Sequence, residues 1–492
     1  MKVHLLTPAG ADPAPARDLD QGDADLVRDL GLDDVVTAMA GGDALIRDVA
    51  LDVLLRPLTD LDAIRWRQDV VRDTLDAPAA VAELYRLATD AVGTESRVRG
   101  WWISNEPSSV LGRSVALMRA LLGPLRDLRS WADGHGTLPS AGMCDLVAEV
   151  TANLTEEWFR EVEAHLRRLS NPDVVLTLRL GPTGTGSGHV LASMEPARRS
   201  WLGRSRPDES TILVPESDTA ASQALTELRE RGLRLVANAL AQSAEQVLAF
   251  FGQLRREAAF LLGCATLEQR LRDLGLAVSF PEARPVGREL AATALVDVGL
   301  AMRTGRPVVA NDLVADGAAA VVVTGANQGG KSTLLRAVGL AQLMAQAGMF
   351  VGAASLRTAV AARLHSHFRR EEDDALESGK LREELLRMSA IVDRVSAGDL
   401  VLSNESFAST NEREASRIAR QLLDGLLEGG LRVAMVTHLT EFSRDLAAEG
   451  RPDVVFLRAE RAADGARTFR VVPGGPLPTG FGADLWERVL GG

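Results

Sequence analysis

The chain has 492 residues, and 46% of them are hydrophobic and 25% charged, an ordinary globular balance that excludes a disordered or collagen-like chain. No apolar run approaches the roughly 18 residues of a membrane-spanning helix, and two cysteines cannot staple a fold of this size. The net charge of −12 argues against general coating of nucleic acid, although a local basic face stays compatible with it. We therefore expect a soluble, reduced, cytoplasmic protein with no membrane partner.

The first half of the chain is predicted to be mainly helical. Residues 1–25, which are rich in Asp, Ala and Pro, are expected to be a loose N-terminal segment. Over about 24–170, and again over 218–278, apolar residues recur at three- and four-residue spacing, which is typical of amphipathic helices. We therefore expect a helical core and lever domain over residues 26–290.

A small β insert is predicted inside this helical domain, over residues 173–214. Three strands are expected there, over residues 174–180, 189–194 and 211–214. The glycine-rich stretch 181–188 is interpreted as a hairpin connection, because no Gly-Lys-Ser/Thr follows it. Arginines gather near the insert and the following helix: Arg167, Arg168, Arg179, Arg198, Arg199, Arg204, Arg206, Arg255 and Arg256. They could contact the phosphates of DNA or form solvated faces interleaved with acids, and the sequence leaves both open.

The strongest signal is a glycine-rich loop after an apolar strand. Residues 321–333 fit G-x-x-x-x-G-K-S/T at every fixed position and precede a helical apolar stripe. In this arrangement backbone N–H groups and the helix start bind phosphate. Lys331 is expected to reach the β- and γ-phosphates of ATP, and Ser332 to ligate Mg²⁺. The expected nucleotide-binding residues are Gly325, Ala326, Asn327, Gln328, Gly329, Gly330, Lys331, Ser332 and Thr333.

Two further predicted strands complete a magnesium–triphosphate site. Residues 399–403 form one of them, and Asn404 and Glu405 follow it directly. A Walker B strand usually ends in Asp-Glu at this place. We expect Glu405 to polarise the attacking water. Asn404 would be a metal ligand that adds no negative charge, so turnover would be slow; the alternative is a buried capping residue. The other strand, 431–437, ends in His438, which we expect to sense the γ-phosphate or position the water.

In chain order, these motifs resemble those of the MutS mismatch-repair ATPases. Residues 324–333 are similar to the family's TGPNMGGKST loop. Four further segments resemble family motifs: 307–311 (PFIAN), 373–380 (DD…SG), 404–410 (DE…ST) and 437–438 (ATH). The resemblance is strong over 305–445 and weak over 45–300.

This resemblance implies a fold and a way of working. The fold class is a C-terminal α/β P-loop domain of the ABC type over residues 291–492, preceded by the mainly helical domain with its β insert. Members of the family are ABC-type ATPases that use ATP and Mg²⁺ and work as dimers, in which a signature loop of each protomer completes the partner's site. The resemblance therefore implies that this chain forms a homodimer. Ser378, Gly379 and Lys380 would form that loop in trans, with Lys380 near the partner's γ-phosphate.

The sequence also departs from the family pattern. Leu381 and Arg382 stand where the family has Ser-Thr after the signature, and Val308 stands where it has an adenine-stacking Phe. We expect no N-terminal mismatch-reading domain, because too little chain precedes the core, and no nuclease or dimerisation module after the ATPase domain. Residues 280–282 match the letters of the mismatch wedge, Phe-x-Glu, but they lie just before the ATPase domain and are not interpreted as one.

Two functions stay open. The first is an ATP-hydrolysing clamp that moves its helical levers on branched or duplex DNA, in repair or recombination. The second is a slowly hydrolysing nucleotide switch that binds a protein partner instead of DNA. The acidic charge and Asn404 favour the switch, whereas the arginines near the β insert favour the clamp. A chromosome-structuring ATPase is disfavoured because long coiled-coil heptads are lacking.

Overall fold

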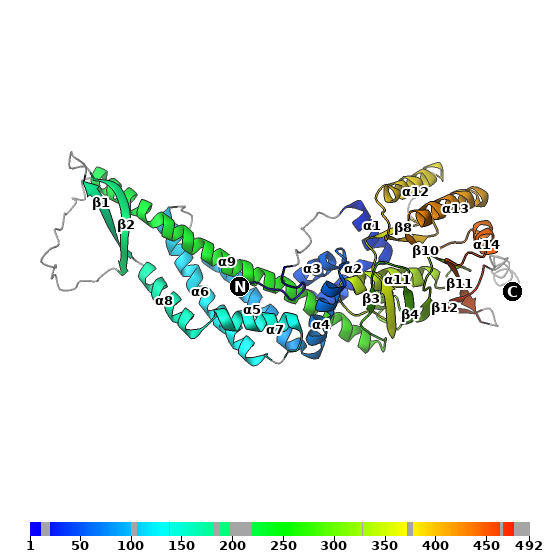
Figure 1. Ribbon diagram of the computed structural model, residues 1–492, viewed down its shortest axis with the longest axis horizontal. Coiled ribbons are helices and arrows are strands. Elements are labelled where there is room, and N and C mark those ends of the chain that lie inside the picture. The colour runs from blue at the N-terminus through cyan, green and yellow to red at the C-terminus, as the bar shows by residue number, and fades with distance from the viewer. Residues whose placement is uncertain are drawn as a thin grey trace. The chain divides into compact units, whose positions relative to one another are not determined.

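The computed structural model describes residues 1–10, 20–99, 106–136, 138–170, 172–180, 186–196, 219–326, 328–370, 377–462 and 466–476. The chain forms two compact units, whose elements are labelled in Figure 1. Unit 1 comprises Met1–His4, Ala79–Pro139 and Met143–Ala258, and unit 2 comprises Leu5–Pro78, Ser140–Gly142 and Ala259–Gly492. Each unit thus combines segments that are distant in sequence, whereas the contiguous domains expected over 26–290 and 291–492 stay predictions.

Unit 1 is built from helices and one hairpin. Its helices are α5 (Pro78–Arg99), α6 (Pro107–Gly134), α7 (Ala141–Asn153), α8 (Glu156–Leu169) and the larger part of α9 (Thr219–Asp273). Trp131 of α6 is buried, and its indole N–H donates to the carbonyl of Ala80 at 3.0 Å, which ties α6 to α5. The expected helical character of this region is confirmed.

The β insert forms an antiparallel hairpin of β1 (Pro172–Leu180) and β2 (Gly186–Pro196). This pair confirms the first two expected strands. The third expected strand, 211–214, and the arginines at 198, 199, 204 and 206 lie outside the described residues.

Four N-terminal helices belong to unit 2: α1 (Gln21–Leu30), α2 (Leu32–Ala40), α3 (Ala44–Leu54) and α4 (Leu61–Asp76). Helix α1 begins at a capping box in which Asp20 and Asp23 each bind the other's backbone N–H. The start of the chain is also packed, because Val3 is 1% exposed and Leu5 is fully buried. Ordered structure is therefore present inside the segment 1–25 that was expected to be loose.

A six-stranded sheet forms the centre of unit 2. Its order is β12 (Arg467–Pro473), β11 (Val454–Arg461), β6 (Ala320–Thr324), β10 (Arg432–Val436), β9 (Leu400–Asn404) and β8 (Leu364–Phe368). All neighbours are parallel except β11 and β12. Strands β6 and β10 are buried along their whole length, as expected of parallel strands covered on both faces. These strands confirm the three predicted from the sequence: the apolar strand before the glycine-rich loop, 399–403 and 431–437.

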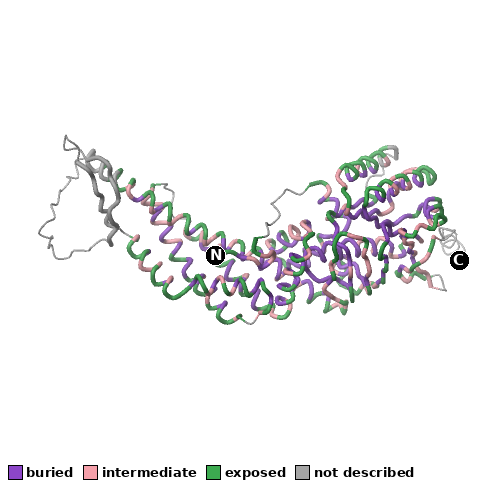
Figure 2. The backbone as a smooth tube through the Cα atoms, viewed as in Figure 1, coloured by how far each residue is buried: buried purple, intermediate pink, exposed green. Residues whose placement is uncertain are grey.

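Helices cover both faces of this sheet. Helices α12 (Glu377–Val392), α13 (Glu412–Glu428) and α14 (Thr440–Ala448) share one hydrophobic core with Val322, Val401 and Met435 of the strands. Helix α11 (Lys331–Gln346) packs on the opposite face, where a Cβ at Gly339 would lie 2.6 Å from Leu402. Figure 2 shows the strands between these helices as buried.

Helix α1 covers the free edge of the sheet. The carboxylate of Asp29 accepts hydrogen bonds from the hydroxyl of Ser366 at 2.8 Å and the backbone N–H of Phe368 at 3.3 Å, both on the edge strand β8. Burial raises the pKa of Asp29. An N-terminal helix therefore completes the C-terminal sheet, because an unpaired edge strand would leave backbone groups exposed.

A smaller four-stranded sheet lies beside the large one. Its order is β3 (Glu282–Arg284), β7 (Ser355–Ala359), β4 (Leu290–Leu295) and β5 (Asn311–Val314), and the short helix α10 (Val298–Thr304) follows β4. Asn311 joins the two sheets, since its side-chain oxygen accepts from the backbone N–H of Val471 in β12 at 2.7 Å.

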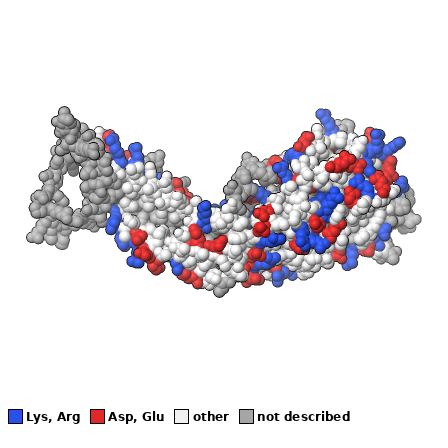
Figure 3. All heavy atoms as spheres, in the orientation of Figure 1, with Lys and Arg blue, Asp and Glu red and all other residues white. Residues whose placement is uncertain are grey.

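The surface mixes both signs of charge. On the face in view in Figure 3, acidic and basic side chains are interspersed. Within the described ranges, no helix combines the length and apolar composition needed to cross a bilayer.

Candidate nucleotide-binding site

The glycine-rich loop connects the buried strand β6 to the start of α11. Gly330 is the N-cap of α11 with φ +92°, and a Cβ there would lie 2.6 Å from the carbonyl oxygen of Phe469. Gly325 has φ +113°, and its Cβ would lie 3.0 Å from the backbone nitrogen of Ala459. Both positions therefore require glycine. Strands β11 and β12 press on the loop and fix its path, so the helix start faces the sheet's carboxyl edge.

Lys331 is held inside this loop. Its side chain is almost fully buried, and its ammonium donates to the carbonyls of Gly325 at 2.7 Å and Ala326 at 3.0 Å. Burial lowers the pKa of Lys331, and the negative charge of Glu405 works against that shift. The ammonium is thus held by the loop's own carbonyls, within electrostatic reach of Glu405, which follows β9.

Ser332 and Asn404 meet at the same edge. The hydroxyl of Ser332 donates to the side-chain oxygen of Asn404 at 3.0 Å, and both residues are half-buried. The sequence-predicted metal ligands are therefore brought together. Mg²⁺ at triphosphate sites takes most of its ligands from phosphate and water, so two neutral oxygens fit it as a weak protein contribution. Among the residues that the structure describes, no cluster of three or more His, Cys, Asp or Glu could hold a metal ion.

Glu405 follows β9 directly. It is half-buried, its backbone N–H donates to the carbonyl of Val436 at 2.9 Å, and its φ is +52°, a left-handed conformation unusual for a non-glycine residue. Its charge acts on Lys331. Glu405 thus lies at the carboxyl end of β9, within electrostatic reach of Lys331.

His438 lies at the end of the neighbouring strand. The backbone N–H of Thr437 donates to Val323 at 3.1 Å, which aligns the end of β10 with the end of β6. The hydroxyl oxygen of Thr437 accepts from the backbone N–H of Leu439 at 3.0 Å and fixes the turn that follows. His438 itself is exposed. His438 therefore lies at the carboxyl edge of the large sheet, like Glu405, and is open to solvent.

The remaining loop residues differ in their surroundings. Gln328 is exposed with φ +60°, and its side-chain oxygen accepts from Arg467 of β12. Gly329 is buried and Thr333 is half-buried. Asn327 lies outside the described residues. Arg467 is a site neighbour that the sequence analysis missed, because nothing in the sequence links it to a loop 139 positions away.

The expected signature loop is helical in the structure. Ser378, Gly379 and Lys380 fall in the first turn of α12, so the description of them as a loop is corrected. Gly379 is exposed, whereas the side chains of Ser378 and Lys380 are not described. A helix start at this position presents backbone N–H groups, the usual anion-binding device.

Phe280, the first residue of the segment that matches the Phe-x-Glu pattern, packs inside unit 2. The ring of Phe280 packs edge-on against Phe350 at 6.4 Å between centroids, and the guanidinium of Arg72 lies 4.2 Å from its centroid. Phe280 is therefore a packing residue of unit 2.

The order of a buried strand, a glycine loop closed by a lysine and a helix defines the P-loop class of nucleotide-binding proteins. Two family models match the chain: the MutS2 N-terminal domain over residues 59–274 and MutS domain V over residues 321–484. The chain therefore belongs to the MutS family.

Curated relatives agree with this assignment. The chain is 26% identical over 466 residues to "Endonuclease MutS2" of Geobacillus thermodenitrificans, which covers 86% of this chain and 58% of the relative. It is 27% identical over 461 residues to "DNA mismatch repair protein MutS" of Synechococcus sp., a match that covers 86% of this chain and 48% of the relative. A shorter match, 31% identical over 176 residues, joins it to "Endonuclease MutS2" of Lactiplantibacillus plantarum, covering 35% and 22%. The chain thus spans less than two thirds of these relatives' length.

Proposed function

We propose that this chain is an ATPase that binds ATP with Mg²⁺ at the loop of residues 325–333 and hydrolyses it. The observation that carries the proposal is the convergence of Lys331, Ser332, Asn404 and Glu405 at one edge of the sheet. Phosphate transfer to water depends mainly on positioning and charge stabilisation, which this arrangement can supply.

Each residue has a proposed role. Lys331 exchanges its two loop carbonyls for the β- and γ-phosphates, Ser332 and Asn404 hold Mg²⁺ and its waters, and Glu405 accepts the proton of the attacking water. The metal, when bound, neutralises charge on the phosphates. His438 senses the γ-phosphate from the end of β10. Because Asn404 adds no negative charge, we infer weak metal binding and slow turnover.

We infer that two copies of the chain work together on DNA. Ser378, Gly379 and Lys380 at the start of α12 would face the partner's nucleotide, so that ATP closes the homodimer. The helical unit, with its long helix α9, would act as core and lever and would clamp branched or duplex DNA. The match to the MutS2 N-terminal domain and the relatives' printed names, mismatch repair protein and endonuclease, support a DNA-related role.

A second function is a nucleotide-dependent switch that hydrolyses slowly and binds a protein partner. The neutral Asn404 at the metal site favours it, and so does the net charge of −12, which weakens attraction to the DNA backbone.

The test is ATP turnover with and without branched, mismatched and plain duplex DNA, with Glu405→Gln as the matched control. We expect the wild-type protein to hydrolyse ATP, DNA to change the rate, and Glu405→Gln to keep ATP binding while kcat falls about 100-fold or more. Tight ATP binding with no DNA affinity would favour the switch. Turnover that is unchanged in Glu405→Gln would refute the assignment of the base.

A further inference from the structure

A buried histidine on β8 contacts the segment that follows the Walker B strand. His367 is fully buried. Its Nε2 lies 3.1 Å from the carbonyl oxygen of Glu384 in α12, and its Nδ1 lies 2.6 Å from the hydroxyl of Ser406. A carbonyl can only accept, so Nε2 carries the proton and Nδ1 accepts from Ser406. One imidazole therefore joins the residue next to Glu405 to the helix that carries the signature residues.

The segment held by this histidine has an unusual backbone. Glu405 has φ +52° and Phe407 has φ +66°, both left-handed, and Ser406 lies between them. Such conformations persist only where the surroundings impose them, and they gather at functional sites. The ring of His367 also stacks on Phe407, with 5.9 Å between centroids and 27° between planes. The imidazole thus contacts the strained segment by hydrogen bonding and by packing.

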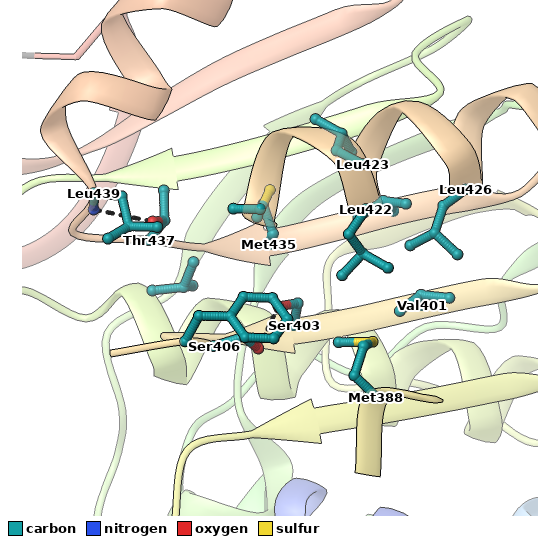
Figure 4. A pocket seen from close by; sticks show the side chains of 14 residues that line it. Met388, Val401, Ser403, Ser406, Leu422, Leu423, Leu426, Met435, Thr437 and Leu439 are labelled. Atoms are coloured by element: carbon teal, nitrogen blue, oxygen red, sulfur yellow. Dashed lines mark hydrogen bonds between the residues drawn. The ribbon is translucent and has the colours of Figure 1, made fainter. Parts of the chain in front are cut away.

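Further hydrogen bonds complete the network. The hydroxyl of Ser403, on β9, lies 2.8 Å from that of Ser406, and the Ser406 hydroxyl also lies 3.2 Å from the backbone carbonyl oxygen of His367. Figure 4 shows these two serines close together at the end of β9. The carboxylate of Glu384 accepts from Ser409 at 3.2 Å and from the backbone of Phe407. Helix α12 is therefore bonded to the strained segment at several points.

The packing leaves this segment little freedom. A cavity of about 20 Å³ lies beside it, lined by Ser403, Ser406, Phe407 and Met388 among others. That volume is close to one water-sized sphere, so the packing beside the segment leaves room for about one water molecule. Movement of the segment relative to α12 therefore requires the hydrogen bonds of His367 to break.

We propose that His367 is a positioning residue for Glu405: through Ser406 it holds the left-handed turn that aims the carboxylate, and through Glu384 it makes that turn move with helix α12. The start of α12 carries Ser378, Gly379 and Lys380, so contact of a partner's nucleotide with these residues is transmitted to Glu405. This inference rests on the proposed ATPase function, in which Glu405 is the base.

Enzyme kinetics test whether His367 and Ser406 position Glu405. Ser406→Ala and His367→Phe remove the hydrogen bond from either side, and we expect each to lower kcat about tenfold while KM and ATP affinity stay within about twofold. His367→Asn offers an oxygen near the position of Nδ1 and should restore part of the rate. The matched control is His365→Gln on the same strand: His365 bonds Asp399 at 3.0 Å, beyond the opposite end of β9. Its kcat should equal the wild-type value.

Hydrogen–deuterium exchange of the nucleotide-free protein tests whether His367 joins the turn after β9 to helix α12. In Ser406→Ala and His367→Phe we expect faster exchange in residues 403–410 and in α12, with unchanged exchange in α11. Rates normalised to the fraction of molecules that bind ATP separate positioning from loss of fold. If Glu405→Gln loses hydrolysis but the His367 and Ser406 variants keep wild-type kcat, the positioning role is overturned and the ATPase proposal stands. If the wild-type protein does not hydrolyse ATP, the proposed function fails, and the exchange result alone decides whether His367 joins the segment to α12.

Discussion

The hydroxyl of Ser332 lies 3.0 Å from the side-chain oxygen of Asn404, although the strands that lead to these residues are not neighbours in the sheet. Strand β10 separates β6 from β9, and the contact forms because α11 begins above the carboxyl ends of all three. Both groups are neutral oxygen donors. The proposed metal site therefore pairs two neutral oxygens, and this pair adds no negative charge.

Asn404→Asp should strengthen the metal site. A carboxylate at this position attracts Mg²⁺ and can still accept the hydroxyl of Ser332, so the Mg²⁺ concentration for half-maximal turnover should fall about tenfold. A magnesium titration of the ATPase rate measures this. Ser332→Ala is the opposite control, because it removes an oxygen and should raise that concentration. An unchanged magnesium dependence in Asn404→Asp would mean that position 404 does not contact the metal.

Gly330→Ala should damage nucleotide binding. The new Cβ would lie 2.6 Å from the carbonyl of Phe469 at a positive φ, so either the loop or β12 must shift. We expect ATP affinity to fall about tenfold, which corresponds to about 1.4 kcal/mol of backbone strain. Gly425→Ala is the matched control: no heavy atom lies within 4 Å of its added Cβ in helix α13. Calorimetric titration with ATP should show normal affinity for this control.

Asp29→Ala should destabilise unit 2. It removes the acceptor of the Ser366 hydroxyl and the Phe368 N–H, and a buried donor left unpaired costs about 1–3 kcal/mol. Asp33→Ala in the next helix is the control, because its ion pair with Arg47 is exposed and such pairs contribute less than about 1 kcal/mol. Urea unfolding should give a lower midpoint for Asp29→Ala than for the control, and equal midpoints would refute the role of α1 at this edge.

Because the imidazole of His367 is buried, we expect the free energy of unfolding to depend on pH. Burial lowers its pKa from 6.5 to about 4, so between these values the unfolded chain binds a proton that the folded chain does not. The stability that neutral His367 provides is therefore complete above pH 6.5 and falls as the pH drops towards 4, by about 1.4 kcal/mol per pH unit. Wild-type and His367→Gln proteins should differ most in free energy of unfolding at neutral pH, and their difference should shrink at pH 5. A difference that stays constant with pH would contradict a buried neutral imidazole.

Much of the nucleotide site is local in sequence and was predicted. The loop motif, the valine run before it and the apolar stripe after it fall within one stretch of chain, and the structure confirms that strand and helix. The ends of β9 and β10 followed from the same reasoning, because parallel strands in one sheet bring their carboxyl ends together. Asn404 and Ser332 could thus be paired from the sequence alone.

Other features depend on contacts between distant segments. Asp29 binds β8 across more than 300 positions, and its own sequence resembles any amphipathic helix with acidic residues. The contacts of Phe469 and Arg467 with the glycine loop depend on the pairing of β12 with β11, which no motif marks. His367 gave no signal either, because the short strand around it also carries His365 and Ser366, and its sequence does not reveal which hydroxyl each histidine will contact.

Binding of a nucleotide by the loop that Lys331 closes can be measured by calorimetric titration of the protein with ATP. We predict that wild-type protein binds ATP with one site per chain, and that Lys331→Ala, shown to be folded by its unfolding midpoint, loses at least about 100-fold in affinity. Equal affinity of the two proteins for ATP would show that Lys331 and its loop do not bind the nucleotide.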